Sequence, residues 1–163
     1  MKRVVLVNGV PASGKSSVAR AISRAGNWPL LTLDTIKEAL FAHLGTGDRD
    51  YNRLLGRASY QAMFDLTADF PDGTTVVMDA WFGFQPADVL ERYIAKAGIA
   101  PALQIWCAAP PEVIGERYRT RVANRSGGHL GLDYVPELIA LATRAKPLAD
   151  YPTLQVDTTA AIA

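Results

Sequence analysis

The sequence predicts a three-layer α/β fold, in which a parallel sheet of five strands lies between helices. Short runs rich in Val, Leu and Ile recur along the chain, and stretches with helical patterning separate them. The runs are continuously apolar, as is typical of strands that are buried on both faces of a parallel sheet. Strands that alternate with helices in this way indicate βαβ units in one layered domain.

Each predicted strand is short and is bounded by turn residues or by a helix. The strands are expected at residues 4–8, 30–33, 75–79, 102–107 and 154–156. Helices are expected at residues 15–25, 35–43, 51–68, 86–97, 111–124 and 134–145. Pro86 and Pro111 stand where the first turn of a helix tolerates proline. Two segments that contain glycine, 45–48 and 126–128, are expected to be the most mobile loops.

The composition is that of a soluble globular protein, with 49% hydrophobic and 20% charged residues. The 163 residues suit a single domain, which we expect to span residues 1–163. With 17 basic and 16 acidic residues, the net charge is +1, so a nucleic-acid partner is not expected. The single Cys107 is expected in the core, and it suits a reducing compartment. We expect a cytoplasmic protein without a membrane segment, either a monomer or a homodimer.

Residues 9–16 match the phosphate-binding pattern G-x-x-x-x-G-K-S, known as Walker A. A predicted strand precedes the motif and a predicted helix follows it, which is the context that the motif requires. Gly9 and Gly14 let backbone N–H groups turn inward around a phosphate, and the start of the helix attracts the same anion. The residues expected to bind the nucleotide here are Gly9, Val10, Pro11, Ala12, Ser13, Gly14, Lys15, Ser16 and Ser17.

Two chemical roles follow for this loop. Lys15 can reach the β- and γ-phosphates, and it is expected to be catalytic. The Ser16 hydroxyl can ligate Mg²⁺, and Asp79 at the end of an apolar run resembles the Walker B carboxylate that helps to hold this ion. ATP and Mg²⁺ are therefore the expected cofactors, with Ser16 and Asp79 as the metal residues, directly or through water.

Asp34 ends the second predicted strand, and ligands of open α/β sheets bind beyond the carboxyl ends of the strands. Its carboxylate could accept a proton from an attacking hydroxyl group. The alternative is that Asp34 caps the helix that begins at Thr35, although a cap can also be a base. Lys37, one turn later, is either a substrate contact on the same rim or a solvated helix lysine.

Arg117, Arg121 and Arg125 recur at a spacing of four residues, which places them on one face of a helix. Because a glycine-rich loop follows, we expect a mobile lid over residues 117–133 that closes on ATP, with Arg117 and Arg121 on the nucleotide. Such a row would neutralise the charge that develops during phosphoryl transfer. The alternative is a solvated face paired with nearby glutamates. His129 follows without an assigned role.

The acceptor is expected between helix 51–68 and the aromatic segment 81–84. A substrate-binding helical region is expected at about 35–70. The aromatic residues either form an apolar wall for the substrate or pack in the core. The expected substrate residues are Asp34, Lys37, Arg57, Asp79, Trp81 and Phe82.

Together these motifs resemble those of the P-loop small-molecule kinases, a group that includes chloramphenicol phosphotransferase-like, gluconokinase-like and shikimate-kinase-like enzymes and AAA-type predicted kinases. The resemblance implies a nucleoside-monophosphate-kinase-like fold with strand order 2-3-1-4-5. It also implies that Asp34 is the general base and that Arg121 and Arg125 are catalytic lid arginines. The segment after the last strand, with Asp157 and Thr158, is implied to lie near the adenine.

The expected function is the ATP-dependent transfer of a γ-phosphoryl group to a hydroxyl of a small molecule, such as a metabolite, a sugar acid or an antibiotic. A polynucleotide 5′-hydroxyl kinase is one alternative, and the near-neutral charge argues against it. Another is a non-catalytic or regulatory nucleotide-binding protein. The sequence lacks the N/T-K-x-D motif that specifies guanine, which argues against a GTPase.

Overall fold

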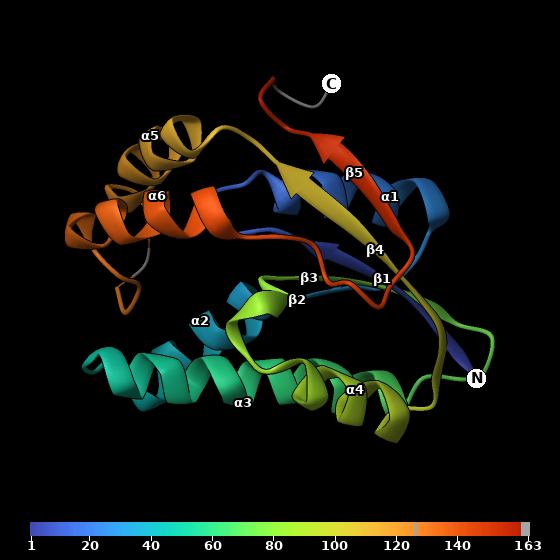
Figure 1. Ribbon diagram of the computed structural model, residues 1–163. Coiled ribbons are helices and arrows are strands. Elements are labelled where there is room, and N and C mark those ends of the chain that lie inside the picture. The colour runs from blue at the N-terminus through green and yellow to red at the C-terminus, as the bar shows by residue number, and fades with distance from the viewer. Residues whose placement is uncertain (126, 161–163) are drawn as a thin grey trace.

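Five parallel strands form the centre of the protein in the computed structural model, which describes residues 1–125 and 127–160 (Figure 1). The strands are β1 (Lys2–Asn8), β2 (Leu30–Thr32), β3 (Thr75–Ala80), β4 (Ile99–Ala108) and β5 (Thr153–Asp157). Their order is β2-β3-β1-β4-β5, and every neighbouring pair is parallel. The predicted fold class and strand order are therefore confirmed.

Helices connect the strands, and each predicted helix is present with ends shifted by a few residues. They are α1 (Lys15–Gly26), α2 (Leu33–Leu44), α3 (Arg49–Ala68), α4 (Ala87–Lys96), α5 (Pro111–Val122) and α6 (Val135–Arg144). Two short 3-10 helices, η1 (Phe82–Phe84) and η2 (Leu132–Tyr134), were not predicted. None of the helices in the described ranges is long and apolar enough to cross a membrane. The loop expected at 126–128 lies partly outside the described residues, because Ser126 is not among them.

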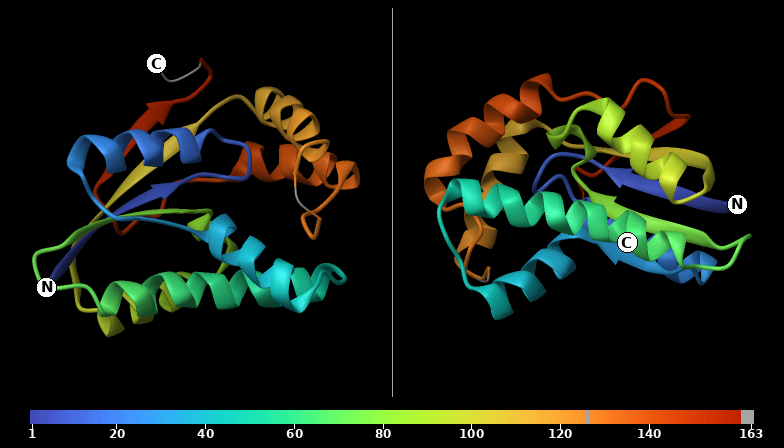
Figure 2. Two further views of the ribbon diagram at one scale, coloured as in Figure 1. Left: turned by 180° about the vertical axis from the view of Figure 1, so that it is seen from behind. Right: turned by 90° about the horizontal axis from the view of Figure 1, so that it is seen from below.

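Helices cover both faces of the sheet (Figure 2). On one face, Val18 of α1 lies in a core with Val5 and Val7 of β1. On the opposite face, α3 and α4 pack in a second core that contains Val4 and Leu6. Successive residues of β1 are thus buried on alternate faces, which explains why its sequence is continuously apolar.

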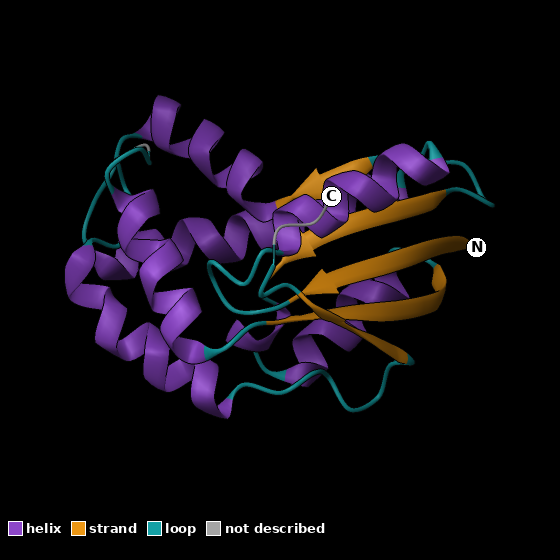
Figure 3. Ribbon diagram, turned by 90° about the horizontal axis from the view of Figure 1, so that it is seen from above, coloured by secondary structure: helices purple, strands orange, loops and turns teal. Residues whose placement is uncertain are grey.

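The carboxyl ends of the strands meet at one edge of the sheet, and several helices gather beyond it (Figure 3). The register pairs Asp79 of β3 with Val7 of β1 and with Thr32 of β2. A third core joins Val10, in the loop after β1, to Leu138 of α6. The loop after β1, the start of α2 and the end of β3 therefore lie together at this edge.

The start of α2 differs from the prediction. Strand β2 ends at Thr32 and the helix begins at Leu33, so the predicted strand 30–33 extends too far. The Thr32 hydroxyl accepts a hydrogen bond from the backbone N–H of Thr35 at 3.1 Å, which makes Thr32 the N-cap. Asp34 is therefore not the cap. It lies in the first helical turn, where the helix dipole stabilises its charge.

A buried pair of amide side chains connects the strands beneath the loop. Asn8 donates from Nδ2 to Oε1 of Gln104 at 2.7 Å, and both side chains are fully buried. Asn8 Oδ1 accepts from the backbone N–H groups of Gly9 at 2.9 Å and of Phe82 at 3.0 Å. Gln104 Oε1 also accepts from the N–H of Leu148 at 3.0 Å. The pair thereby joins the loop after β1 to the segments that follow β3 and precede β5.

Replacing Gln104 by Leu tests this pair. Q104L leaves Asn8 Nδ2 and the Leu148 N–H without these acceptors, and each unpaired buried donor costs about 1–3 kcal/mol. We expect the free energy of unfolding, measured by urea denaturation, to fall by about 2–4 kcal/mol. Q155L, the same change at an exposed position of β5, is the control and should change it by less than about 0.5 kcal/mol. Equal losses in the two variants would contradict the proposed role of the pair.

Candidate functional site

The loop between β1 and α1 depends on unusual backbone angles. Its φ is positive at Gly9 (155°), Ala12 (63°) and Gly14 (85°). A Cβ atom at Gly9 would lie 2.4 Å from the Ser13 hydroxyl oxygen and 2.9 Å from the carbonyl oxygen of Cys107. Only glycine fits such a space, and the tight curl that results lies in front of the N-terminus of α1. This arrangement is suited to cradling a phosphate group.

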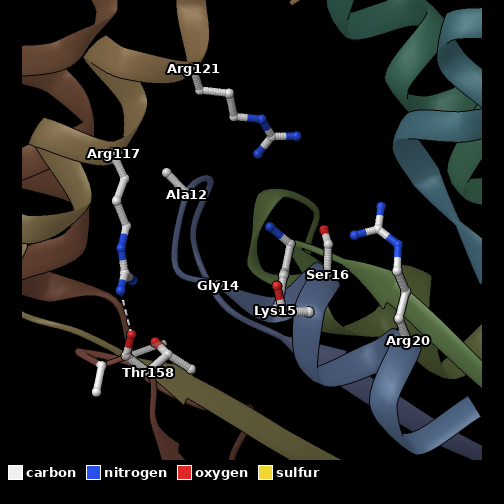
Figure 4. Close-up of a pocket in the computed structure, with 10 residues that line it drawn as sticks. Ala12, Gly14, Lys15, Ser16, Arg20, Arg117, Arg121 and Thr158 are labelled. Atoms are coloured by element: carbon white, nitrogen blue, oxygen red, sulfur yellow. Dashed lines mark hydrogen bonds between the residues drawn. The ribbon is translucent and has the colours of Figure 1, made fainter. Parts of the chain in front are cut away.

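A cavity of about 460 Å³ lies against this loop, and we call it the P-loop cavity (Figure 4). The start of α1 lines it with Lys15, Ser16 and Arg20. Arg117 and Arg121 reach it from α5. The first two arginines of the predicted row therefore face the loop that was predicted to bind phosphate.

The segment after β5 closes one end of the P-loop cavity. The buried Thr158 hydroxyl donates to the carbonyl oxygen of Ser13 at 2.6 Å. Arg117 donates to the carbonyl oxygen of Thr158 at 2.5 Å (Figure 4). It also donates to the carbonyl oxygen of Thr159 at 3.0 Å. The Asp157 carboxylate accepts from the N–H of Thr159 at 2.8 Å and does not line the cavity. Of the two residues expected here, the structure brings Thr158 to the cavity and leaves Asp157 outside.

A second cavity of about 650 Å³ surrounds the carboxyl edge of the sheet, and we call it the rim cavity. Lys15, Ser16 and Arg121 line both cavities, so the two spaces meet at the start of α1. The walls of the rim cavity come from α2, from α3, from the segment after β3 and from α5 and α6. The predicted acceptor residues that line it are Asp34, Lys37, Arg57, Asp79 and Trp81.

Phe82 is the exception among the predicted acceptor residues. It is 1% exposed and packs in the core, with its ring centre 5.8 Å from that of Tyr60. Its neighbours Trp81 and Phe84 line the rim cavity instead. The aromatic segment therefore divides between core and cavity, because the 3-10 turn directs its successive side chains to different sides.

Asp34 is the charged centre of the rim cavity. Its Oδ2 accepts hydrogen bonds from Nη2 of Arg125 at 2.6 Å and from Nη2 of Arg121 at 3.2 Å. Burial by itself would raise the pKa of Asp34, but the charges of Arg125 and Lys15 lead a set of opposing effects that lower the pKa below its ordinary 3.8. The carboxylate is therefore ionised at neutral pH.

Lys37 connects Asp34 to the neighbouring helix. Its ammonium group donates to Oδ1 of Asn52 at 2.6 Å and lies 5.5 Å from the centre of the Phe41 ring. Burial is the main reason that the pKa of Lys37 falls below 10.5, and the charge of Asp34 opposes this shift. The Asn52 amide in turn donates to the carbonyl oxygen of Gly128. Asn52 thus links α2, α3 and the turn after α5.

The turn after α5 is packed against α2. His129 Nε2 lies 2.9 Å from Oε1 of Glu38, and its ring meets Phe41 edge-on at 5.5 Å. A Cβ atom at Gly128, where φ is 97°, would come within 2.9 Å of the Phe41 ring. Burial, followed by the charge of Arg125, lowers the pKa of His129 below 6.5, so the imidazole is mainly neutral at pH 7.

Buried polar atoms without a hydrogen-bond partner concentrate at the two cavities. In the part of the chain that the structure describes, six side chains carry such an atom. Five of them belong to the P-loop or to residues that line the cavities, namely Ser13, Asp79, Gln85, Arg117 and Arg125. Because unpaired buried groups cost free energy, their concentration here indicates a site for a polar ligand.

The predicted metal residues suit Mg²⁺. Asp79 is 5% exposed at the end of β3, and its Oδ1 has no hydrogen-bond partner among the described residues. The Ser16 residue lies where the two cavities meet. Outside residues 126 and 161–163, no group of three or more His, Cys, Asp or Glu side chains is arranged to hold a metal. A sparse ligand set is typical of Mg²⁺, which keeps several waters and binds substrate phosphates.

Several residues of the rim cavity were not predicted from the sequence. Asn52 and Gln85 carry amides, whose roles depend on neighbours that are distant in the sequence. Arg49 and Arg144 come from the ends of α3 and α6, and Arg49 pairs with Glu137 at 2.5 Å. The four-residue spacing of the arginines along α3 was the signal that could have indicated that this helix lines the cavity with positive charge.

Asp34 should stabilise the folded protein in a pH-dependent manner. Because its pKa is lowered from 3.8 on folding, the stabilisation is present above that value and is lost as the pH falls through the folded pKa. We expect D34N to lower the free energy of unfolding at neutral pH by at most about 1 kcal/mol, since solvent reaches the ion pair. The difference from the wild-type protein should shrink as the pH falls below 3.8 and vanish once Asp34 is protonated in the folded state. Urea denaturation of both proteins at a series of acidic pH values measures this difference in the free energy of unfolding.

The control is D150N, at an exposed position outside both cavities, which should change the free energy of unfolding by less than about 0.5 kcal/mol. A difference between D34N and the wild-type protein that grows toward low pH would contradict the assigned direction.

Comparison with known proteins places this site in a family. The sequence matches the family described as AAA domain over residues 4–132. A solved structure of a "putative kinase" from Chloroflexus aurantiacus J-10-fl is 29% identical, with a TM-score of 0.84 over 97% of this chain and 89% of that chain. No curated protein matches the chain.

Two further solved structures share the fold. A gluconokinase from Sinorhizobium meliloti 1021 is 22% identical, with a TM-score of 0.58 over 96% of this chain and 82% of its own. A shikimate kinase from Bacteroides thetaiotaomicron is 18% identical, with a TM-score of 0.53 over 87% of this chain and 79% of its own. Since the family match covers most of the sequence and includes the P-loop, this chain belongs to the AAA domain family and has the fold of the P-loop small-molecule kinases.

Proposed function

We propose that this protein is an ATP-dependent phosphotransferase that moves the γ-phosphoryl group to a hydroxyl group of a small molecule. The observation that carries the proposal is the meeting of two cavities at Lys15, Ser16 and Arg121. A transfer between two substrates needs two spaces that share charged groups along the path of the transferred group. Asp34 lines only the rim cavity, where the acceptor hydroxyl would lie.

In this proposal ATP occupies the P-loop cavity. The loop backbone and the N-terminus of α1 hold the phosphates, and Lys15 neutralises their charge. Lys15 Nζ donates to the carbonyl oxygen of Val10 at 3.3 Å, a weak contact that a phosphate oxygen can replace. Mg²⁺ held by Ser16 and Asp79, directly or through water, would supply further neutralisation of the phosphates. Thr158 and Arg117, which line the same cavity, would contact the nucleoside.

The acceptor hydroxyl would lie against Asp34 in the rim cavity. Its oxygen forms a bond to the γ-phosphorus, the bond from that phosphorus to the bridging oxygen of ADP breaks, and the hydroxyl proton passes to the Asp34 carboxylate. Because the pKa of Asp34 is lowered, the carboxylate is ionised before the transfer, so it orients the hydroxyl first and accepts the proton late. Arg121 and Arg125, which already donate to Asp34, would stabilise the charge on the transferring group.

Residues 117–133 would serve as the lid of this site. Arg117 lines the P-loop cavity, Arg125 lines the rim cavity and Arg121 lines both, so the row follows the proposed path of the phosphoryl group. The contacts of Gly128 with Asn52 and of His129 with Glu38 hold the turn against the helical region at 35–70. A lid closed in this way would exclude water and limit hydrolysis of ATP.

Gly14 and Gly73 form a matched pair for testing the donor site. Both have a φ of 85°, but a Cβ atom at Gly14 would lie 3.1 Å from Thr158, whereas one at Gly73 would have no described atom within 4 Å. We expect G14A to weaken binding of the ATP analogue Mg·AMP-PNP about tenfold or more, a loss of about 1.4 kcal/mol, because the loop backbone must shift. G73A should lose about 1 kcal/mol of stability and bind as the wild-type protein does. If calorimetry gave G14A and G73A equal affinities for Mg·AMP-PNP, the P-loop would not be the donor site.

Asp34→Asn tests the proposed base. With an identified acceptor, we expect kcat to fall by a factor of about 10²–10⁴ while the KM for ATP stays within about twofold, because the carboxylate acts on the acceptor. ADP release in a coupled assay provides the measurement, and D150N is the control. Phosphorylation by D34N at the full rate would rule out Asp34 as the base.

A further inference from the structure

The rim cavity carries far more positive charge than the protein as a whole. Eight of its lining residues are lysine or arginine, and three are aspartate or glutamate. Across the whole sequence the two kinds nearly balance, with 17 basic and 16 acidic residues. About half of all positive side chains therefore line one cavity, which makes the cavity attractive to anions.

These charges fall into two groups. The inner group lies at the start of α1 and α2 and at the end of α5, and it consists of Lys15, Lys37, Arg121 and Arg125, together with Asp34 and Asp79. The outer group comes from α3 and α6, which the ion pair between Arg49 and Glu137 joins. It consists of Arg49, Arg53, Arg57 and Arg144, together with Glu137. The spacing of four residues on α3 keeps its three arginines on one face of the helix.

The proposed chemistry accounts for the inner group only. ATP and the transferring group would use Lys15, Arg121 and Arg125, as described above. In the outer group, Glu137 pairs with Arg49 at 2.5 Å, and Arg53 lies 3.4 Å from the exposed Asp50. Ion pairs between described residues involve neither of the other two outer arginines, Arg57 and Arg144.

We infer that the acceptor is itself an anion, with its hydroxyl group at Asp34 and a carboxylate or phosphate group at Arg57 and Arg144. This inference rests on the proposed kinase function and defines the acceptor class. A guanidinium group presents paired N–H donors that match either a carboxylate or a phosphate. Two of them, which line the same cavity from α3 and α6, would therefore hold the charged end of the acceptor while Asp34 orients the other end.

The cavity wall also offers apolar surface that suits the uncharged middle of the acceptor. Trp81 and Phe84 provide apolar surface in the rim cavity. The neighbouring Gln85 has a buried Nε2 without a hydrogen-bond partner in the described chain, and it lines the same cavity. An oxygen atom of the acceptor would satisfy this donor, because an unpaired buried N–H is costly.

The test uses sets of three hydroxyl compounds that differ at one end, such as D-glucose, D-gluconate and D-glucose 6-phosphate, or glycerol, D-glycerate and glycerol 3-phosphate. ADP release measures turnover, and thermal stabilisation of the protein loaded with Mg·AMP-PNP measures binding without turnover. Loading first keeps the added anion away from the P-loop. We expect the charged members to be favoured at least tenfold over the neutral member in kcat/KM or in affinity. The carboxylate and phosphate members distinguish the two kinds of anion.

Arg57→Gln and Arg144→Gln locate the charged end. We expect each variant to raise the KM of the charged acceptor, or its Kd, at least tenfold, while the affinity for Mg·AMP-PNP stays unchanged. R92Q is the matched control, because Arg92 is exposed on α4, pairs with Asp88 and lies outside both cavities.

The outcomes separate the inference from the proposed function. If neutral compounds are phosphorylated as well as charged ones, and R57Q and R144Q behave as R92Q does, the acceptor is not an anion although the protein is a kinase. If charged compounds bind through Arg57 and Arg144 without ADP release, the anion site stands and the kinase proposal fails. Absence of any preference in both turnover and binding overturns the inference.

Discussion

The hydrogen bond between Asn8 and Gln104 is the interaction on which the geometry of the site depends. A parallel sheet brings the ends of its strands to one edge, but it does not determine the path of the loops that leave them. The side-chain oxygen Oδ1 of Asn8 accepts hydrogen bonds from both the first N–H of the P-loop and the N–H of Phe82. The loop proposed for the donor and the aromatic segment proposed for the acceptor are thereby fixed to one buried side chain.

The charges around the rim cavity oppose the stability of the protein that holds them. Eight like charges repel one another when one fold gathers them, and the inner ones are only partly balanced by Asp34 and Asp79. The unpaired buried atoms of Arg117, Arg125 and Gln85 add to this cost. A fold tolerates such a loss of stability where a ligand supplies the missing partners, as proposed here for a nucleotide and an anionic acceptor.

The parallel sheet and the P-loop were predictable because local patterns carry them, namely continuous apolar runs and glycine at a fixed spacing. The strand order came only from the resemblance to the P-loop kinases. The cap of α2 was not, because Thr32 and Asp34 are both good caps and the pairing of Thr32 with Asp79 decides where β2 ends. The burial of Phe82 depends on a 3-10 turn that has no strong sequence signal. The outer group of charges was not predictable either, because pairs such as Arg49 and Glu137 join residues that are far apart in the chain.

The single cysteine gives the protein a practical property. Cys107 is 1% exposed behind the P-loop, and burial raises the pKa of its thiol to about 12, so the reactive thiolate is scarce. Dyes and spin labels directed at thiols should therefore spare the native chain. Cysteines introduced at the exposed Leu54 on α3 and Leu132 on η2 would be the reactive ones. The native sequence is thus a ready background for spectroscopic measurement of the distance between α3 and η2.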